Sequence, residues 1–336
     1  MAEVSVQERL RRRPSACEPW LARAFGVELA LHFEAPALRP AQVDVATDPT
    51  VLELVYASSL DAGWSASETQ PLGWMPDGRG GALLESREHP ELGVLFRAGV
   101  HGRYLIGPDA RHVACAPPSV AEWYWQRMLV GQILPLVAAL RELYVIHASA
   151  VSLGDRAIAI AGPPGAGKST LAMELALAGH SLLAEDVVAL RLGKGGVLAE
   201  PGVALVNLQP TDQARRLIED TALPVLGRSH KIHVSLPRAA RALPLSALYL
   251  LESADRGLGS GDRVETLDSP SAPDLIGTAF TPYLSGREYL LRHLEFAAAL
   301  AGSAAVARVW VDRAVPPAQL AREIREHAES AVRQAA

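Results

Sequence analysis

Residues 162–170 read GPPGAGKST and match the pattern G-x-x-x-x-G-K-[ST] at every defined position. Glycines allow a tight turn and let several backbone N–H groups point at one anion. A strand pattern precedes the stretch, and a helical pattern over residues 168–177 follows it and stops at Gly179. Such a helix adds the positive end of its dipole at the same point. These residues therefore predict a phosphate-binding loop between a strand and a helix.

The loop predicts a nucleotide site but leaves hydrolysis, switching and phosphoryl transfer open. Lys168 is expected to reach the β- and γ-phosphates, Ser169 to bind Mg²⁺ through its hydroxyl, and Thr170 to support the base or the α-phosphate. ATP and Mg²⁺ are the expected ligands, although no base-reading motif separates ATP from GTP. The expected nucleotide-binding residues are Gly162, Pro163, Pro164, Gly165, Ala166, Gly167, Lys168, Ser169 and Thr170.

Two adjacent acids, Glu185 and Asp186, interrupt an apolar strand pattern over residues 181–192. Strand alternation would place them on opposite faces unless the strand ends there. Acids in an apolar run are costly unless they are paired or bound to a cation. One acid could serve the metal, with Ser169 and Asp186 as the predicted ligands, while the other takes the proton of an attacking hydroxyl. The alternative is one metal-binding acid beside a bystander.

Three further residues are candidates for the same site. His147, in the strand pattern VIHASAV, could orient an acceptor or a base, or it could be structural. A cation near the γ-phosphate would stabilise charge in the transition state of a transfer reaction. Lys231 and Arg228, in the segment RSHKIHVSLP, are the candidates, and a basic turn leading into a strand is the alternative.

The chain reads as two regions of an α/β protein. Residues 1–116 carry short apolar runs separated by turn residues, which predicts a smaller β-rich N-terminal region. Residues 117–336 begin with a helix at 120–143, kinked at Pro135, followed by a hairpin that turns at Gly154 and Asp155. Further strands are predicted at 197–199, 203–208, 231–236 and 245–252, and helices at 211–220, 286–300 and 316–332.

Composition narrows the class of protein. The 336 residues are 49% hydrophobic and carry a formal net charge of −5, which argues against a nucleic-acid partner because such a partner requires a basic face. The two cysteines, Cys17 and Cys115, have no metal or redox spacing and indicate reduced thiols in the cytoplasm. No apolar run is long enough to span a membrane, and no signal-peptide core is present. A homo-oligomer is compatible with the sequence.

Four elements in order resemble the catalytic domain of HPr kinase/phosphorylase. They are His147 on a strand pattern, the loop GPPGAGKS, a helical pattern ending at Gly179 and His180, and the segment AEDV at 184–187. The resemblance implies a P-loop kinase related in fold to phosphoenolpyruvate carboxykinase that phosphorylates a serine on a protein. It also implies that the acid pair carries the base and metal roles, with His147 in the same site.

The chain departs from that family in two places. Glu185 stands where the family has its first aspartate, and residues 198–214 keep Glu200 and Gly202 but lack the arginine of the family's signature. These departures leave phosphorolysis, hexamer formation and HPr as a substrate without support. The segments PGVALVNLQP and RSHKIHVSLP look more like those of HPr-kinase-like proteins of peptide-modification gene clusters, such as lasso peptide tail kinases.

The expected activity is therefore ATP- and Mg²⁺-dependent phosphorylation of a serine or threonine hydroxyl on a peptide or protein. The N-terminal region is expected to help hold that acceptor, and a precursor peptide of such a gene cluster is one candidate. The alternatives are a kinase of a small-molecule alcohol and a P-loop ATPase or regulator without a phosphoryl acceptor.

Overall fold

The computed structural model describes residues 10–13, 18–61, 69–76, 82–118, 122–229, 231–254, 263–280, 287–312 and 314–335. Cys17 lies outside these residues. The chain divides into two compact units: Met1–Glu142 with Thr281–Tyr289, and Leu143–Phe280 with Leu290–Ala336. The division after Glu142 lies later in the chain than the boundary at 116/117 that the sequence suggested.

The first unit is built on one mixed sheet, in the order β3-β1-β2-β4-β9-β8-β7-β6-β5. The β2–β4 and β4–β9 pairs are parallel and the other pairs are antiparallel. Its strands are β1 Trp20–Ala24, β2 Val27–Leu31, β3 Gln42–Val43, β4 Thr50–Leu54, β5 Gln70–Pro76, β6 Ala82–His89, β7 Gly93–Arg97, β8 Arg103–Ile106 and β9 His112–Ala116. Short helical turns lie at Pro36–Ala41, Ala57–Asp61 and Gly99–His101. Strands therefore make up most of the regular structure described in this unit.

The predicted helix at 120–143 packs on this first sheet. It consists of α3 Glu122–Met128, a π-helical turn Leu129–Ile133 and α4 Leu134–Leu140. Tyr104 donates to the carbonyl of Trp125 at 2.7 Å, and Gln126 donates to the carbonyl of Glu34 at 2.7 Å. These contacts explain why the first unit extends to Glu142. The π-helical turn directly precedes Pro135, which lacks the N–H that a regular helix would use there.

The second unit contains a larger sheet in the order β10-β14-β15-β19-β12-β11-β13, with β21 also paired to β19 and β20 paired to β21. The β12–β19 and β19–β21 pairs are parallel, so their carboxyl ends lie at one edge. The strands are β10 Tyr144–Ile146, β11 Ala148–Leu153, β12 Arg156–Ala161, β13 Leu182–Ala184, β14 Val188–Gly193, β15 Gly196–Glu200, β19 Leu243–Ser253, β20 Val264–Thr266 and β21 Ala305–Val311.

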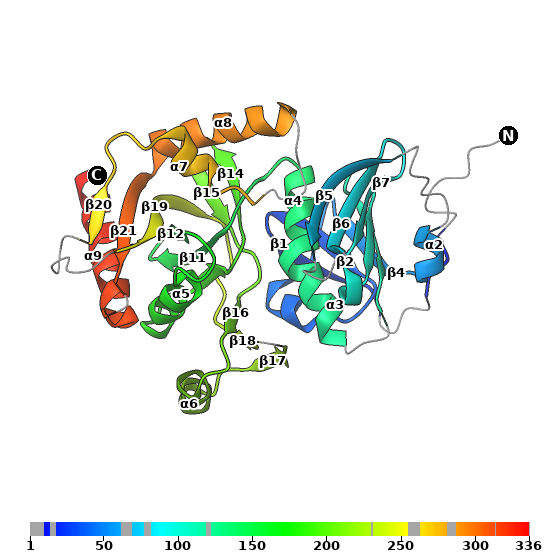
Figure 1. The fold of residues 1–336 in the computed structure, drawn as a ribbon, viewed down its shortest axis with the longest axis horizontal. Helices are drawn as coiled ribbons and strands as arrows, with labels where there is room; N and C mark the ends of the chain where they lie inside the picture. Colours follow the sequence, from blue (N-terminus) through cyan, green and yellow to red (C-terminus); the bar gives the residue numbers. More distant parts are fainter. Residues whose placement is uncertain are drawn as a thin grey trace. The chain divides into compact units, whose positions relative to one another are not determined.

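Helices cover this sheet on both faces, which makes the unit a mixed α/β structure (Figure 1). Phe296, Ala297 and Leu300 of α8 (Arg287–Ser303) belong to one apolar cluster. The other cluster contains residues of α5 (Lys168–Leu177) and of α9 (Pro317–Ala335). A short helix, α7 (Ala272–Ile276), precedes α8.

A small sheet extends from the second unit (Figure 1). It has the order β16-β18-β17, with β16 Leu205–Leu208, β17 Val225–Arg228 and β18 Ile232–Ser235, all antiparallel. The helix α6, Asp212–Thr221, connects β16 to β17, and Thr211 caps it by accepting a hydrogen bond from the N–H of Ala214 at 3.2 Å. The strands and helices predicted for residues 197–252 are therefore present with small shifts at their ends.

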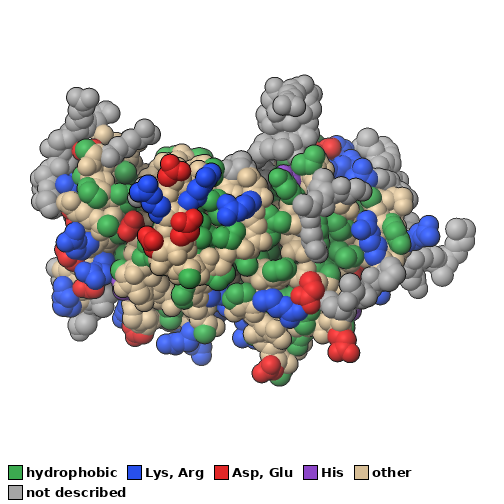
Figure 2. All heavy atoms as spheres, turned by 90° about the horizontal axis from the view of Figure 1, so that it is seen from below, with side chains coloured by type: hydrophobic (Ala, Val, Ile, Leu, Met, Phe, Trp, Pro, Cys, Tyr) green, Lys and Arg blue, Asp and Glu red, His purple; other side chains and the backbone are tan. Residues whose placement is uncertain are grey.

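Acidic, basic and apolar side chains are interspersed on the face drawn in Figure 2. Among the residues that the structure describes, no helix has the length and apolar character needed to cross a lipid bilayer.

Candidate functional site

The predicted phosphate loop lies between the end of β12 at Ala161 and the start of α5 at Lys168. Gly167 has a φ of 105°, a left-handed conformation that residues with a Cβ rarely adopt. A Cβ on Gly162 would lie 2.8 Å from the Cβ of Leu251 on β19, so the loop passes too close to that strand for any side chain. The left-handed backbone at Gly167 and the close approach of Leu251 to Gly162 therefore explain why glycine occupies both positions.

Lys168 is buried at the base of this loop. Its Nζ donates hydrogen bonds to the carbonyl of Gly162 at 2.9 Å and to that of Pro163 at 3.3 Å. Burial lowers the pKa of Lys168, and the nearby carboxylates of Asp186 and Glu185 oppose that shift. The ammonium is thus held at the loop, close enough to the two acids for their charges to act on it.

The acid pair lies in a break shared by two antiparallel strand pairs. β10 pairs with β14 through Ile146 and Val188, and β11 pairs with β13 through Ala150 and Ala184. His147 is the residue between β10 and β11, and residues 185–187 lie between β13 and β14. The sequence placed His147 and the acids on strands, whereas both segments leave the ladder at the same level. Asp186 has a φ of 69°, so the strict alternation expected within a strand does not apply to the two acids.

Glu185 is buried and both of its carboxylate oxygens are hydrogen bonded. Oε1 accepts from the hydroxyl of Ser169, and Oε2 accepts from Nδ2 of Asn207 at 2.8 Å. Burial raises the pKa of Glu185 to about 7, and the charge of Asp186 adds to this shift. The hydroxyl of Ser169, the ammonium of Lys231 and the amide of Asn207 act in the opposite direction.

Asp186 is the more accessible acid, with 45% of its side chain exposed. Its Oδ1 lies 3.6 Å from Nδ1 of His147. Burial lowers the pKa of His147, the charge of Asp186 opposes this, and Lys168 reinforces it. The His147 N–H donates to the carbonyl of Thr278 at 2.7 Å, which fixes the backbone beside the acid. His147 and Asp186 therefore form a pair with one carboxylate open to solvent.

These groups line one cavity of about 580 Å³. Its polar wall contains His147, Lys168, Ser169, Asp186, Asn207 and Lys231. Apolar side chains from α5, β16 and α6 also line it: Met173, Leu208, Ala214 and Leu217. Of the two cations predicted from the sequence, Lys231 lines the cavity. Arg228 is exposed at the end of β17 and is absent from the lining.

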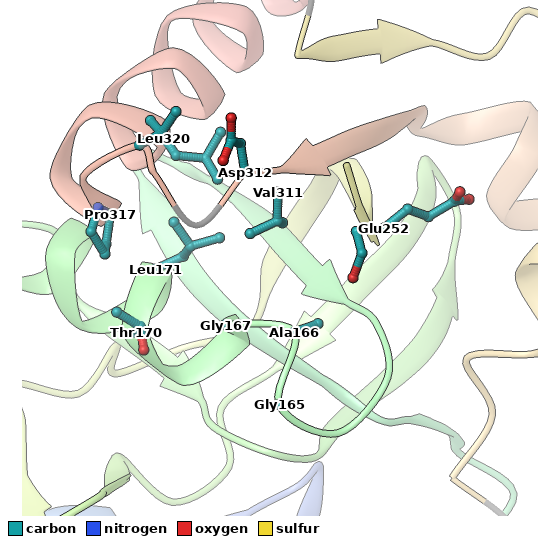
Figure 3. Close-up of a pocket in the computed structure, with 12 residues that line it drawn as sticks. Gly165, Ala166, Gly167, Thr170, Leu171, Glu252, Val311, Asp312, Pro317 and Leu320 are labelled. Carbon is teal, nitrogen blue, oxygen red and sulfur yellow. The ribbon is translucent and has the colours of Figure 1, made fainter. Parts of the chain in front are cut away.

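A second cavity of about 260 Å³ borders the phosphate loop at the carboxyl ends of β12, β19 and β21 (Figure 3). It shares Gly165, Gly167, Thr170 and Pro317 with the first cavity. Leu171, Val311 and Leu320 lie around it, and Glu252 points away from these three side chains (Figure 3). Glu252 accepts a hydrogen bond from Arg308 at 2.7 Å. No motif in the sequence predicts this cavity, because its lining comes from three segments that are far apart in the chain.

The oxygens near Ser169 fit a magnesium ion. A hydroxyl and carboxylates are ligands that Mg²⁺ prefers, and Mg²⁺ is commonly held by one or two carboxylates together with substrate phosphates and water. Among the described residues, no group of three or more histidines, cysteines and acids forms a metal cluster, so the protein would supply only one or two such ligands. The acid that contacts Ser169 is Glu185, whereas the sequence analysis had grouped Ser169 with Asp186.

Three polar residues escaped the sequence analysis. Asn207 of β16 contacts Glu185, and behind it His233 of β18 and Ser229 continue the hydrogen bonding. The sequence offers one indication of them. In the strand patterns VALVNL and KIHVSL, a polar residue stands where strand alternation predicts a buried side chain. That signal does not say which polar groups meet.

Comparisons with known proteins give remote structural likeness alone. No family model and no curated protein matches the chain. One solved structure with detectable similarity is the Hpr(Ser) kinase/phosphatase from Coxiella burnetii, which is 12% identical. The match covers 55% of this chain and 97% of that one, with a TM-score of 0.31. A likeness this weak carries no argument about fold or activity.

Proposed function

We propose that the protein is an ATP- and Mg²⁺-dependent kinase that transfers the γ-phosphoryl group to a serine or threonine hydroxyl of a peptide or protein. The observation that carries this proposal is the accessible carboxylate of Asp186, which lines the same cavity as Lys168, Ser169 and Lys231. A nucleotide-binding switch needs the loop but has no use for a second, solvent-accessible acid beside it. A transfer enzyme needs such an acid to accept the proton of the attacking hydroxyl.

The two cavities suggest how ATP would bind. The phosphates would lie against the backbone N–H groups of residues 162–167 and the start of α5. The smaller cavity, at the carboxyl ends of parallel strands, is where open α/β sheets commonly take a ligand, and its apolar side chains suit a nucleobase. Ser169 and Glu185 would hold Mg²⁺, which neutralises charge on the β- and γ-phosphates when bound.

The chain's own groups account for the transfer step. Asp186 accepts the proton of the acceptor hydroxyl as that oxygen forms a bond to the γ-phosphorus. The bond from the γ-phosphorus to the oxygen bridging the β- and γ-phosphates breaks, and ADP leaves with the electron pair. Lys168 and Lys231 stabilise the negative charge that is spread over the phosphoryl oxygens. His147, neutral near pH 7 because burial lowers its pKa, orients Asp186.

The larger cavity supports a peptide as the acceptor. Its apolar side, with Met173, Leu208 and Leu217, would accommodate an apolar residue next to the hydroxyl of a peptide chain. We propose the first unit as a further holder of that peptide, a modified precursor peptide as the kind of substrate, and the cytoplasm as the compartment. We also propose that the second unit is a carboxykinase-like P-loop domain, because residues of its phosphate loop, Asp186 and His147 line one cavity.

The proposal is tested by incubating the protein with Mg²⁺, γ-labelled ATP and candidate peptides. Asp186→Asn is the matched variant, since asparagine tolerates the left-handed backbone of this position better than alanine. Wild type should label a peptide hydroxyl, and the variant should lose transfer by about 10²-fold or more while still binding nucleotide. Label found only as free phosphate would refute the kinase and favour an ATPase or regulator. Equal transfer by the variant would refute the role of Asp186.

A further inference from the structure

A chain of hydrogen bonds leads from Glu185 through Asn207 of the cavity wall into the small sheet. Asn207 Nδ2 lies 2.8 Å from Glu185 Oε2, and Asn207 Oδ1 lies 2.5 Å from His233 Nδ1. His233 Nε2 lies 2.9 Å from Ser229 Oγ, which in turn accepts from the N–H of Lys231 at 3.2 Å. The chain therefore begins at the backbone of the cation and ends at the acid that contacts Ser169.

The partners assign a donor and an acceptor to every bond in this chain. When Glu185 is ionised its oxygens only accept, so Asn207 then turns its NH₂ group to Glu185 and its oxygen to His233. That oxygen requires a proton on His233 Nδ1. Ser229 Oγ accepts from a backbone amide and has its own proton left for His233 Nε2. All donors thus point from Lys231 towards Glu185, an arrangement in which successive bonds polarise one another.

The chain passes through the interior at His233 and follows the pairing of the small sheet, whereas Asn207 and Ser229 are half-buried. His233 has none of its surface exposed. Asn207 and His233 are cross-strand partners in the β16–β18 ladder, and His233 also faces Gly227 of β17. A second bond, from the N–H of Ser229 to the carbonyl of Lys231 at 2.8 Å, ties these two residues together. The rigid sheet therefore sets where Glu185 and the backbone of Lys231 lie.

We propose that Asn207, His233 and Ser229 are positioning residues that hold Glu185 against Ser169 and hold Lys231 at the cavity. Their effect on transfer rests on the proposed function, whereas the proton arrangement does not. A buried polar cluster that serves stability alone would have no reason to join these two groups. This one links Glu185, which contacts the cavity-lining Ser169, to the backbone of Lys231 on the cavity wall.

The proton arrangement is tested first, by nitrogen NMR of protein labelled with ¹⁵N-histidine. At a pH above the pKa of Glu185, where this acid is ionised, His233 should be neutral with its proton on Nδ1, and its signals are assigned by their loss in His233→Asn. A proton on Nε2 alone, or on both nitrogens, would overturn the chain of donors. This measurement needs no substrate, so the tautomer can be determined even if the wild-type protein transfers no phosphoryl group.

The positioning role is tested by two substitutions at one site. His233→Asn keeps an N–H donor close to the position of Nδ1, whereas His233→Leu removes it. Leucine should lower kcat by about 10- to 100-fold with little change in the KM for ATP, and asparagine should recover most of the loss. If both variants lower kcat equally, or if they change only the unfolding midpoint, His233 is a structural residue and the proposal fails.

Ser229→Ala covers the case in which the leucine variant does not fold. Ser229 is only half-buried, so its loss is tolerated more easily than a change at His233. In this variant the proton of His233 should no longer be confined to Nδ1, which changes the nitrogen shifts of the ring. The value of kcat should fall by roughly tenfold. Unchanged shifts together with unchanged kcat would overturn the proposal. Absence of transfer in wild type, with the expected tautomer present, would instead refute the kinase alone.

Discussion

At the scale of single residues, the site separates two acids that are adjacent in sequence. Glu185 is buried, accepts two hydrogen bonds and lies against Ser169, whereas Asp186 is half-exposed beside His147. The difference arises because the chain leaves the sheet after Ala184 and turns through a left-handed conformation at Asp186. The proposed roles, metal binding for Glu185 and proton transfer for Asp186, rest on this difference in surroundings, which residue type alone left open.

Glu185 should make the stability of the protein depend on pH. Its pKa is raised from 4.5 to about 7, so the folded state binds a proton that the unfolded state releases as the pH rises through this range. The stabilisation that this proton provides is complete below about pH 4.5 and is lost as the pH approaches 7. Relative to Glu185→Gln, wild type should lose on the order of 3 kcal/mol of unfolding free energy between about pH 5 and pH 8.

Urea unfolding in the presence of a chelator measures this difference. The glutamine variant is a close control, because its amide oxygen can still accept from Asn207 or Ser169. Parallel pH profiles for the two proteins would contradict the raised pKa of Glu185.

The two predicted cations offer a matched comparison. Lys231 lines the cavity and Arg228 does not, although they lie three residues apart. Lys231→Met should lower kcat by roughly 10²-fold or more, because a cation that stabilises the transferred group is lost, and Arg228→Met should leave kcat unchanged. Steady-state assays with labelled ATP distinguish them. An equal loss in both variants would point to peptide binding by surface charge.

At the scale of elements, the sequence predicted what local patterns determine. The hairpin β11–β12, the phosphate loop and α5 each follow from turn residues, a motif or helical periodicity, and the structure contains them at the expected positions. The sequence did not determine whether the strand is interrupted between Ala184 and Val188, because an apolar run does not show where pairing partners change. The contact of Asn207 with His233 depends on strand register across 26 residues, so no local signal could have indicated it.

The phosphate loop should be more sensitive at Gly162 than its motif suggests. A methyl group there would meet Leu251 of the neighbouring strand at 2.8 Å, so Gly162→Ala should cost about 1–3 kcal/mol of unfolding free energy and weaken nucleotide binding at least about tenfold. Gly131→Ala is the control, since a methyl group at Gly131 meets nothing within 4 Å. Calorimetry gives both quantities. Tight nucleotide binding by Gly162→Ala would show that the loop can move away from β19.

At the scale of the whole molecule, the described residues that form both cavities beside the phosphate loop belong to the second unit. Nucleotide binding should therefore be a property of that unit, while the proposed hold on the acceptor peptide calls on the first. The first unit has its own apolar cluster around Val55, Leu95 and Ala114, as expected of a part that folds around its own core.

A chain comprising residues 143–336 should fold and bind ATP with Mg²⁺ as tightly as the full chain does. Transfer to a peptide should fall more than nucleotide affinity, because the proposed acceptor contacts of the first unit are missing. Circular dichroism checks folding, and fluorescence titration with a labelled nucleotide checks binding. A folded fragment that binds no nucleotide would show that the first unit contributes to the nucleotide site.

The shared break between the strand pairs has a consequence for descent and for design. The ladders on either side of it pair without residues 147 and 186, so the two side chains at these positions can change while the strand pairing persists. Relatives that have lost the carboxylates could keep the same scaffold and serve as inactive binding proteins. The identity of a few side chains at the break, rather than the overall fold, should therefore decide whether a protein with this scaffold transfers phosphoryl groups.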